Sequence, residues 1–181
     1  MNEELEVLKE VTKRLDKVKI VYVISGSIAA NYYTIPRMTR DLDIVVEMKE
    51  ADISRFVRLF ADDFFVDREM ISEEVKKKGM FNLIHTKYVI KIDFILRKES
   101  AWQEMMFARR QKIRIDKISA WIISIEDLVI AKLLWAKDSL SEMQLSDVRN
   151  LLRSTHHKDL AYLKKWVHNL GLEGIYQRVQ E

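Results

Sequence analysis

The sequence predicts a single mixed α/β (α+β) domain, a mixed sheet flanked by helices, with strands in its first two thirds and helices at its end. Apolar residues near the start recur at helical spacing, short β-branched runs follow, and from Ser124 onward the periodicity is helical. We expect residues 1–123 to form the α/β core and residues 124–181 a helical segment packed on it as part of one structural unit.

The elements expected first are a helix, a strand and a short second helix. The apolar residues of the first helix lie on one face: Leu5, Leu8, Val11, Leu15 and Val18. The run IVYVI (20–24) predicts a buried strand that ends before Gly26. The following helix, from Ser27 to Tyr33, must end before Pro36, because a residue ahead of proline avoids the helical region.

The later elements are expected to be strands and then helices. DLDIVVEM (41–48) predicts a strand and residues 51–61 a helix. MFNLIHT (80–86) and YVIKIDFIL (88–96) are separated by so little chain that we expect an antiparallel pair. KIRID and KISAWII predict one or two more strands, and residues 124–137, 141–154 and 159–170 predict helices before a short tail.

The composition fits a globular protein without disulfides. Of 181 residues, 48% are hydrophobic and 33% charged, and the net charge is +3 with its signs interspersed. No apolar run is long enough for a membrane span, and MNEELEVLKE lacks the apolar stretch of a signal peptide, so we expect a cytoplasmic protein with no membrane partner. Because the chain has no cysteine, any metal would have oxygen or histidine ligands.

Two aspartates stand at the head of a strand that otherwise has the character of a core strand. Asp41 and Asp43 are separated by one residue, which puts both carboxylates on one face of a strand, roughly 7 Å apart. Two such charges repel unless a cation lies between them, and hard oxygen ligands suit Mg²⁺ or Mn²⁺. Taken alone, the pair also fits charges at a strand edge.

Asp93, in the later strand KIDF, is a third acidic candidate. If its strand lies beside the first, three carboxylates converge, and such a cluster can hold two metal ions. Gly26 and Ser27, at a strand–helix junction, would offer a close backbone approach and a helix N-terminus to phosphate. Singly, Ser27 fits a helix N-cap and Asp93 a solvent-facing partner of Lys91, whereas their order along the chain favours a shared site.

The motif Gly26-Ser27 … Arg37-Met38-Thr39-Arg40-Asp41-Leu42-Asp43, followed by the acid in KIDF, resembles the nucleotidyltransferase superfamily related to DNA polymerase beta. The resemblance covers about residues 21–96. It implies a sheet with flanking helices, Mg²⁺ on Asp41 and Asp43 with Asp93 completing the site, and nucleotide phosphates on Gly26 and Ser27. Arg37 and Thr39 also match the pattern, Arg37 as a phosphate contact and Thr39 as the residue that shapes the turn into the strand.

The segment IEDLVIAKLLWAK resembles the helix after the catalytic sheet in small prokaryotic members, including the nucleotidyltransferase-type toxins of abortive-infection systems. Their Asp-x4-Lys element is matched by Asp127 and Lys132. Asp127 also fits a capping box with Ser124. Lys132 has apolar helical neighbours and either extends past them to solvent or reaches the nucleotide's phosphates.

The resemblance implies transfer of a nucleoside monophosphate from a nucleoside triphosphate to an acceptor hydroxyl, with release of pyrophosphate and with Asp93 accepting the proton. A small molecule, a tRNA end and a protein side chain are all compatible acceptors, and a homodimer is possible. The alternative is a nucleotide-binding or toxin–antitoxin interaction module without transfer activity. A metal-dependent phosphodiesterase is disfavoured, because such sites usually recruit histidines and none falls in these motifs. We expect the four tryptophans in the core or an interface.

Overall fold

A mixed sheet runs through the protein in this computed structural model, which describes residues 3–39, 41–115, 118–139 and 141–180. Within these ranges the sheet has seven strands in the order β3-β4-β5-β2-β1-β7-β6. Their bounds are β1 (Val21–Ile24), β2 (Asp41–Glu47), β3 (Phe64–Phe65), β4 (Met80–His85), β5 (Lys91–Leu96), β6 (Gln111–Ile115) and β7 (Ile118–Ile122). The predicted mixed α/β class is therefore confirmed.

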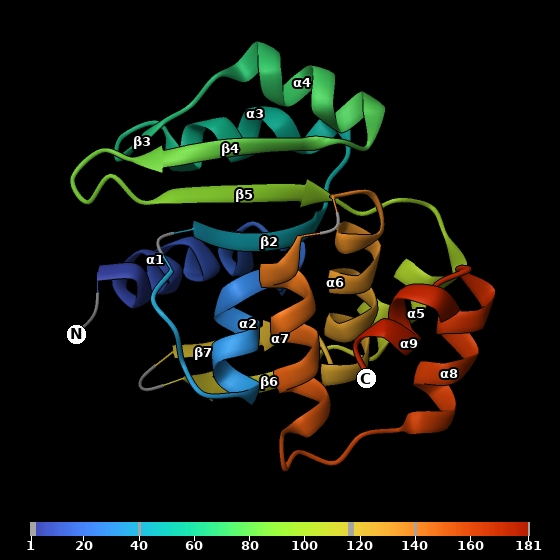
Figure 1. The fold of residues 1–181 in the computed structure, drawn as a ribbon. Coiled ribbons are helices and arrows are strands. Elements are labelled where there is room, and N and C mark those ends of the chain that lie inside the picture. The colour runs from blue at the N-terminus through green and yellow to red at the C-terminus, as the bar shows by residue number, and fades with distance from the viewer. Residues whose placement is uncertain (1–2, 40, 116–117, 140, 181) are drawn as a thin grey trace.

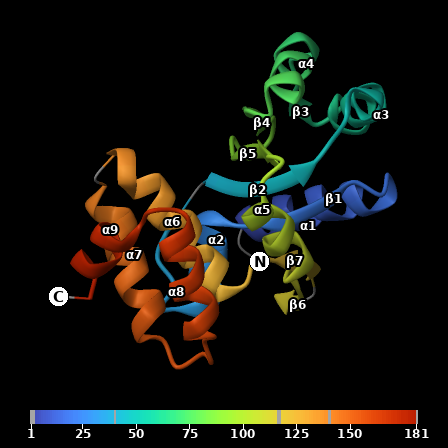
Figure 2. The ribbon, with the colours of Figure 1, turned by 90° about the vertical axis from the view of Figure 1, so that its right-hand side faces the viewer.

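The helices form two groups on either side of the sheet (Figures 1 and 2). Helices α3 and α4 lie together near β4, and α6 packs against α2, α7, α8 and α9. The bounds are α1 (Glu3–Lys17), α2 (Gly26–Tyr33), α3 (Glu50–Phe60), α4 (Arg68–Lys77), α5 (Ala101–Ala108), α6 (Ile125–Ser139), α7 (Glu142–Arg153), α8 (Leu160–Asn169) and α9 (Glu173–Arg178). Across the described ranges, none of the helices has both the length and the apolar character that a membrane crossing requires.

The predicted strand pairing is confirmed, whereas some short elements were not predicted. β4 and β5 pair antiparallel, and the KIRID and KISAWII segments form the antiparallel pair β6–β7. The sequence patterns did not predict helices α4 and α5, the two-residue strand β3, or α9 in the expected tail. Helices α4 and α5 each begin with a side-chain cap. Asp67 accepts from the Met70 N–H at 3.0 Å, and Ser100 accepts from the Gln103 N–H at 3.3 Å.

The centre of the sheet brings β5 beside β2. The two strands run parallel, and their register places Asp41 opposite Lys91 and Asp43 opposite Asp93. Alternate residues of both strands are fully buried, among them Leu42, Ile44, Ile92 and Phe94. A slip of one residue would expose these side chains and bury the charged ones, so the core itself specifies the register.

Asp127 ties three helical segments together at the start of α6. Its fully buried carboxylate accepts hydrogen bonds from Trp102 Nε1 at 2.9 Å, the Tyr162 hydroxyl at 2.7 Å and the Ser124 hydroxyl at 2.7 Å. The Asp127 N–H in turn donates to Ser124 Oγ at 3.2 Å, as a capping interaction. Since Trp102 is on α5 and Tyr162 on α8, this carboxylate joins both helices to α6.

Replacing Asp127 with alanine should lower the free energy of unfolding by about 3 kcal/mol, because it leaves several buried donors without an acceptor. Urea denaturation followed by circular dichroism measures the change. Asp62→Ala, at an exposed position, is the matched control and should change stability by less than about 0.5 kcal/mol. Equal stabilities of the two variants would contradict the structural role of Asp127.

Candidate active site

A cavity of about 290 Å³ opens where α2 begins, between the central strands and α6. It combines charged and polar groups with an apolar wall. Its polar lining consists of Ser25, Gly26, Ser27, Asp43, Asp93, Lys132 and Gln144. Its apolar lining consists of Met80, Ile95, Leu128, Ala131 and Trp135. Four of the residues singled out in the nucleotidyltransferase-like pattern, together with Lys132, thus line one cavity.

Asp43 and Asp93 face this cavity from adjacent strands. They are register partners of β2 and β5, and Asp93 is 9% exposed. Burial raises the pKa of the Asp43 carboxyl above its ordinary value, and the neighbouring negative charge of Asp93 raises it further. Lys132 and a backbone hydrogen bond from Ser27 oppose that rise without cancelling it. Burial and the neighbouring carboxylate thus both disfavour the charged form of Asp43.

Asp41 is not part of the cavity lining and lies at the exposed head of β2. Its side chain is 57% exposed, and its nearest charged partner is Lys91, whose Nζ lies 3.9 Å from Asp41 Oδ1 and 2.9 Å from Asp93 Oδ2. Among the described residues, no three carboxylate or imidazole side chains are arranged as a metal-binding group. The structure thus brings two of the three predicted acids into the cavity and leaves the third beside Lys91.

The carboxylate pair is chemically suited to a divalent cation. Hard oxygen donors are the ligands that Mg²⁺ and Mn²⁺ prefer. A cation bound beside Asp43 would favour the charged form of its carboxyl, which burial and Asp93 disfavour. The donor set and its electrostatics therefore fit the implied metal.

Gly26 is required by the geometry of the bend between β1 and α2. Its φ of +59° lies in the left-handed region that glycine adopts readily. A Cβ at this position would overlap the Asp43 carboxylate. The Ser25 N–H donates to the Asp43 backbone oxygen at 2.9 Å, which holds the bend against β2. The N-terminus of α2 is thus in contact with Asp43, and helix N-termini favour bound phosphate.

Two basic side chains approach the cavity and share one buried acid. Arg37 donates to Asp147 through Nε at 3.2 Å and through a terminal nitrogen at 3.0 Å, and that same nitrogen donates to Ser27 Oγ at 2.8 Å. Lys132 Nζ donates to Asp147 at 2.8 Å and to Gln144 Oε1 at 2.9 Å. Lys132 is 3% exposed, so it does not extend to solvent.

Asp147 was not predicted as a site residue. Burial alone would raise the pKa of its carboxyl, but the hydrogen bonds from Arg37 and Lys132 outweigh burial and hold that pKa below its ordinary value. A usable signal exists in the sequence: Asp147 lies one turn before Leu151 on the buried side of an amphipathic helix. A lysine on the apolar face of α6 requires such a partner, since an unpaired buried charge is strongly unfavourable.

Thr39 lies outside the cavity. Its hydroxyl donates to the Asp41 backbone oxygen at 3.3 Å and accepts from the Asp41 N–H at 3.4 Å, so it shapes the chain entering β2. Arg37 is held just before it by Asn31, whose side chain bonds both the N–H and the carbonyl of Arg37 at 2.9 and 2.7 Å. Arg40, between the motif residues, lies outside the described residues.

Trp135 and Met80 flank the cavity as partly exposed apolar side chains. Trp135 is 57% exposed and Met80 44%. Trp135 therefore does not belong to the core of this chain, and its place in an interface stays a prediction. Helical periodicity could not predict the exposure of Trp135, because it indicates which residues share a face of α6 but not which other elements cover that face.

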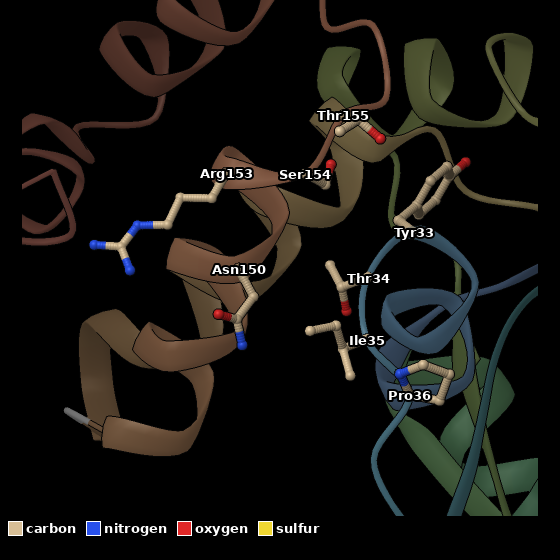
Figure 3. A pocket seen from close by; sticks show the side chains of 8 residues that line it. All are labelled: Tyr33, Thr34, Ile35, Pro36, Asn150, Arg153, Ser154 and Thr155. Atoms are coloured by element: carbon tan, nitrogen blue, oxygen red, sulfur yellow. The ribbon is translucent and has the colours of Figure 1, made fainter.

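Two larger hollows carry no comparable chemistry. One, of about 560 Å³, lies between the end of α2 and the end of α7, and Figure 3 shows Arg153 directed away from Thr34 and Ile35 there. The residues that line it include no carboxylate. The other, of about 640 Å³, borders Arg37 and Thr39 and has Glu4 as its acidic residue. Neither combines paired acids with a helix N-terminus, so the smaller cavity is the candidate site.

No protein-family model matches the sequence, and no curated protein matches it. Several solved structures share its fold. The antibiotic-resistance factor ANT(2'')-Ia is 9% identical, with a TM-score of 0.63 over 99% of this chain and 98% of that one. A lincosamide antibiotic adenylyltransferase, solved with lincomycin bound, is 13% identical, with a TM-score of 0.55 over 84% and 97%.

A putative nucleotidyltransferase from Thermotoga maritima is 18% identical, with a TM-score of 0.54 over 78% of this chain and 89% of that chain. These identities are too low to carry substrates or residue roles from one chain to another, but the shared architecture extends over most of each protein. It agrees with the family resemblance of the Gly-Ser and D-x-D pattern. The chain therefore has the nucleotidyltransferase fold.

Proposed function

We propose that the protein transfers a nucleoside monophosphate from a nucleoside triphosphate to an acceptor hydroxyl. The observation that carries the proposal is the adjacent Asp43–Asp93 pair, with Asp43 in contact with the Gly26–Ser27 bend, inside one cavity. In the reaction, the hydroxyl oxygen forms a bond to the α-phosphorus, and the bond from that phosphorus to the bridging oxygen breaks. Pyrophosphate leaves, and the hydroxyl proton passes to a carboxylate, for which we propose Asp93.

Asp43 and Asp93, with the exposed Asp41, would hold one or two Mg²⁺ or Mn²⁺ ions. Such ions, when bound, neutralise phosphate charge and make a hydroxyl more acidic. The N–H groups at the start of α2 would bind the β- and γ-phosphates. Lys132 and Arg37 would add positive charge, and Asp147 would orient both, since it already bonds each of them.

The apolar wall gives the cavity two chemically different ends. Its charged end suits the triphosphate, whereas Met80 and Trp135 present partly exposed apolar surface beside it. A small molecule, a tRNA end or a protein side chain remains compatible as acceptor.

A nucleotide-binding module without transfer activity is the second candidate. It is favoured by Lys91, which pairs with Asp93 and thereby competes for the carboxylate that transfer would use. Calorimetry with ATP and GTP, with and without Mg²⁺, separates the candidates: binding that needs no metal favours the module, and metal-dependent binding favours the enzyme.

Asp43→Asn and Asp93→Asn should each reduce transfer by at least about 100-fold, the scale on which losing one preorganised charge-stabilising group slows an enzyme. The stability of Asp43→Asn should be unchanged or slightly higher, because repulsion within the pair is relieved. Label incorporation from radioactive triphosphates into candidate acceptors, with Mg²⁺ or with EDTA, measures activity. Asp62→Asn, at an exposed site, is the control. Equal incorporation by all proteins would refute the proposal.

Gly26→Ala should abolish transfer, because its Cβ displaces the Asp43 carboxylate, and should lower the free energy of unfolding by about 1–2 kcal/mol through the left-handed φ. Gly174→Ala provides the matched control, since nothing lies within 4 Å of its Cβ and it is inside α9. That variant should keep full activity and gain up to about 1 kcal/mol. Activity of Gly26→Ala comparable to wild type would mean that the bend is not part of the site.

A further inference from the structure

Lys91 occupies a defined place in the array of acidic side chains. It lies two residues before Asp93 on β5, so both side chains emerge on the same face of the strand. The register puts Lys91 opposite Asp41, just as Asp93 is opposite Asp43. One face of two adjacent strands therefore presents a square of three carboxylates and one ammonium group.

The ammonium group of Lys91 is the cation that pairs with these acids. Its Nζ is 2.9 Å from Asp93 Oδ2 and 3.9 Å from Asp41 Oδ1. Lys132, which lines the cavity, and Arg37, which donates to Ser27, form their ion pairs with Asp147 instead. Lys91 is thus the basic residue that pairs with the negative charges of Asp41 and Asp93.

The same carboxylate oxygens are the ones that would bind a divalent cation. Because Asp93 Oδ2 is hydrogen-bonded to Lys91, a metal ion at this oxygen must replace or share the ammonium group. The Lys91 side chain is 41% exposed and rotates on a flexible stem, so it can move to solvent, whereas the Asp93 side chain is 12% exposed.

We propose that Lys91 is the resident counter-cation of the acid cluster: it stabilises the metal-free protein and competes with the divalent ion for the carboxylates. The competition rests on the proposed function, whereas the stabilising effect in the absence of metal does not. Lys91 would thereby set how much free Mg²⁺ or Mn²⁺ the protein requires before its site is filled. Lys91 would thus act indirectly, through its ion pairs with Asp41 and Asp93, and not by contact with the substrate.

Lys91→Met tests the proposal, because it keeps the length of the side chain and removes the charge. In EDTA, its midpoint of thermal unfolding should fall by about 2–4 °C, the shift typical of one lost favourable interaction in a domain of this size. Calorimetric titration with Mn²⁺, without nucleotide, should show binding about tenfold tighter than in wild type. The difference in stability between wild type and Lys91→Met should therefore shrink or change sign as Mn²⁺ is added.

Three further variants isolate the charge at this position. Lys87→Met, in the turn between β4 and β5, changes the net charge equally and should leave Mn²⁺ affinity unaltered; in the structure its Nζ contacts the Tyr88 hydroxyl at 3.1 Å. Lys91→Arg keeps the charge and should bind Mn²⁺ like wild type. Lys91→Gln retains a hydrogen-bond donor without charge and should also bind Mn²⁺ more tightly than wild type. It replaces Lys91→Met in the titration if that variant folds poorly.

The outcomes distinguish this proposal from the enzymatic one. If wild type binds Mn²⁺ and both neutral variants bind it no more tightly, the competition is refuted while the proposed function stands. If none of the proteins binds Mn²⁺, the proposed metal-dependent function fails together with the competition. If Lys91→Met is as stable in EDTA as wild type, the stabilising role of Lys91 is refuted whatever the metal does.

Discussion

The parallel pairing of β2 with β5 is the constraint on which the candidate site depends. Asp43 and Asp93 lie fifty residues apart in the sequence, and the ladder makes them direct neighbours. Flanking residues of both strands are buried, so the hydrophobic core pins the register that juxtaposes two mutually repelling groups. Apolar burial on both strands thus offsets a local electrostatic penalty at the cavity.

Charge around the cavity follows one pattern: each basic group has an acidic partner, and the Asp43 carboxyl has the least compensation. Arg37 and Lys132 converge on Asp147, and Lys91 pairs with Asp93. The consequence is a site whose basic side chains are already held in position by acidic partners, while burial and Asp93 raise the pKa of the Asp43 carboxyl. Such preorganisation would serve the proposed phosphoryl transfer, in which a protein supplies positioning and charge neutralisation rather than covalent chemistry.

The framework around this site is held by contacts that the chemistry does not use. Asp127 belongs to the Asp-x4-Lys element, yet its carboxylate faces Trp102, Tyr162 and Ser124 rather than the cavity. Lys132, five residues later, does line the cavity. The two members of one sequence element therefore have different roles, one in anchoring α6 against α5 and α8 and one at the site.

The sequence by itself determined the α/β class, most of the helices and the β4–β5 pairing, which follow from local periodicity and from close spacing along the chain. Its motif also indicated five of the residues that line the cavity: Gly26, Ser27, Asp43, Asp93 and Lys132. Only the tertiary structure decided that Asp41 stays outside the cavity lining, that Asp147 holds Arg37 and Lys132, and that Trp135 is exposed. Local patterns report which face of an element is apolar, whereas the partners of a charged side chain depend on helix and strand packing between residues distant in sequence.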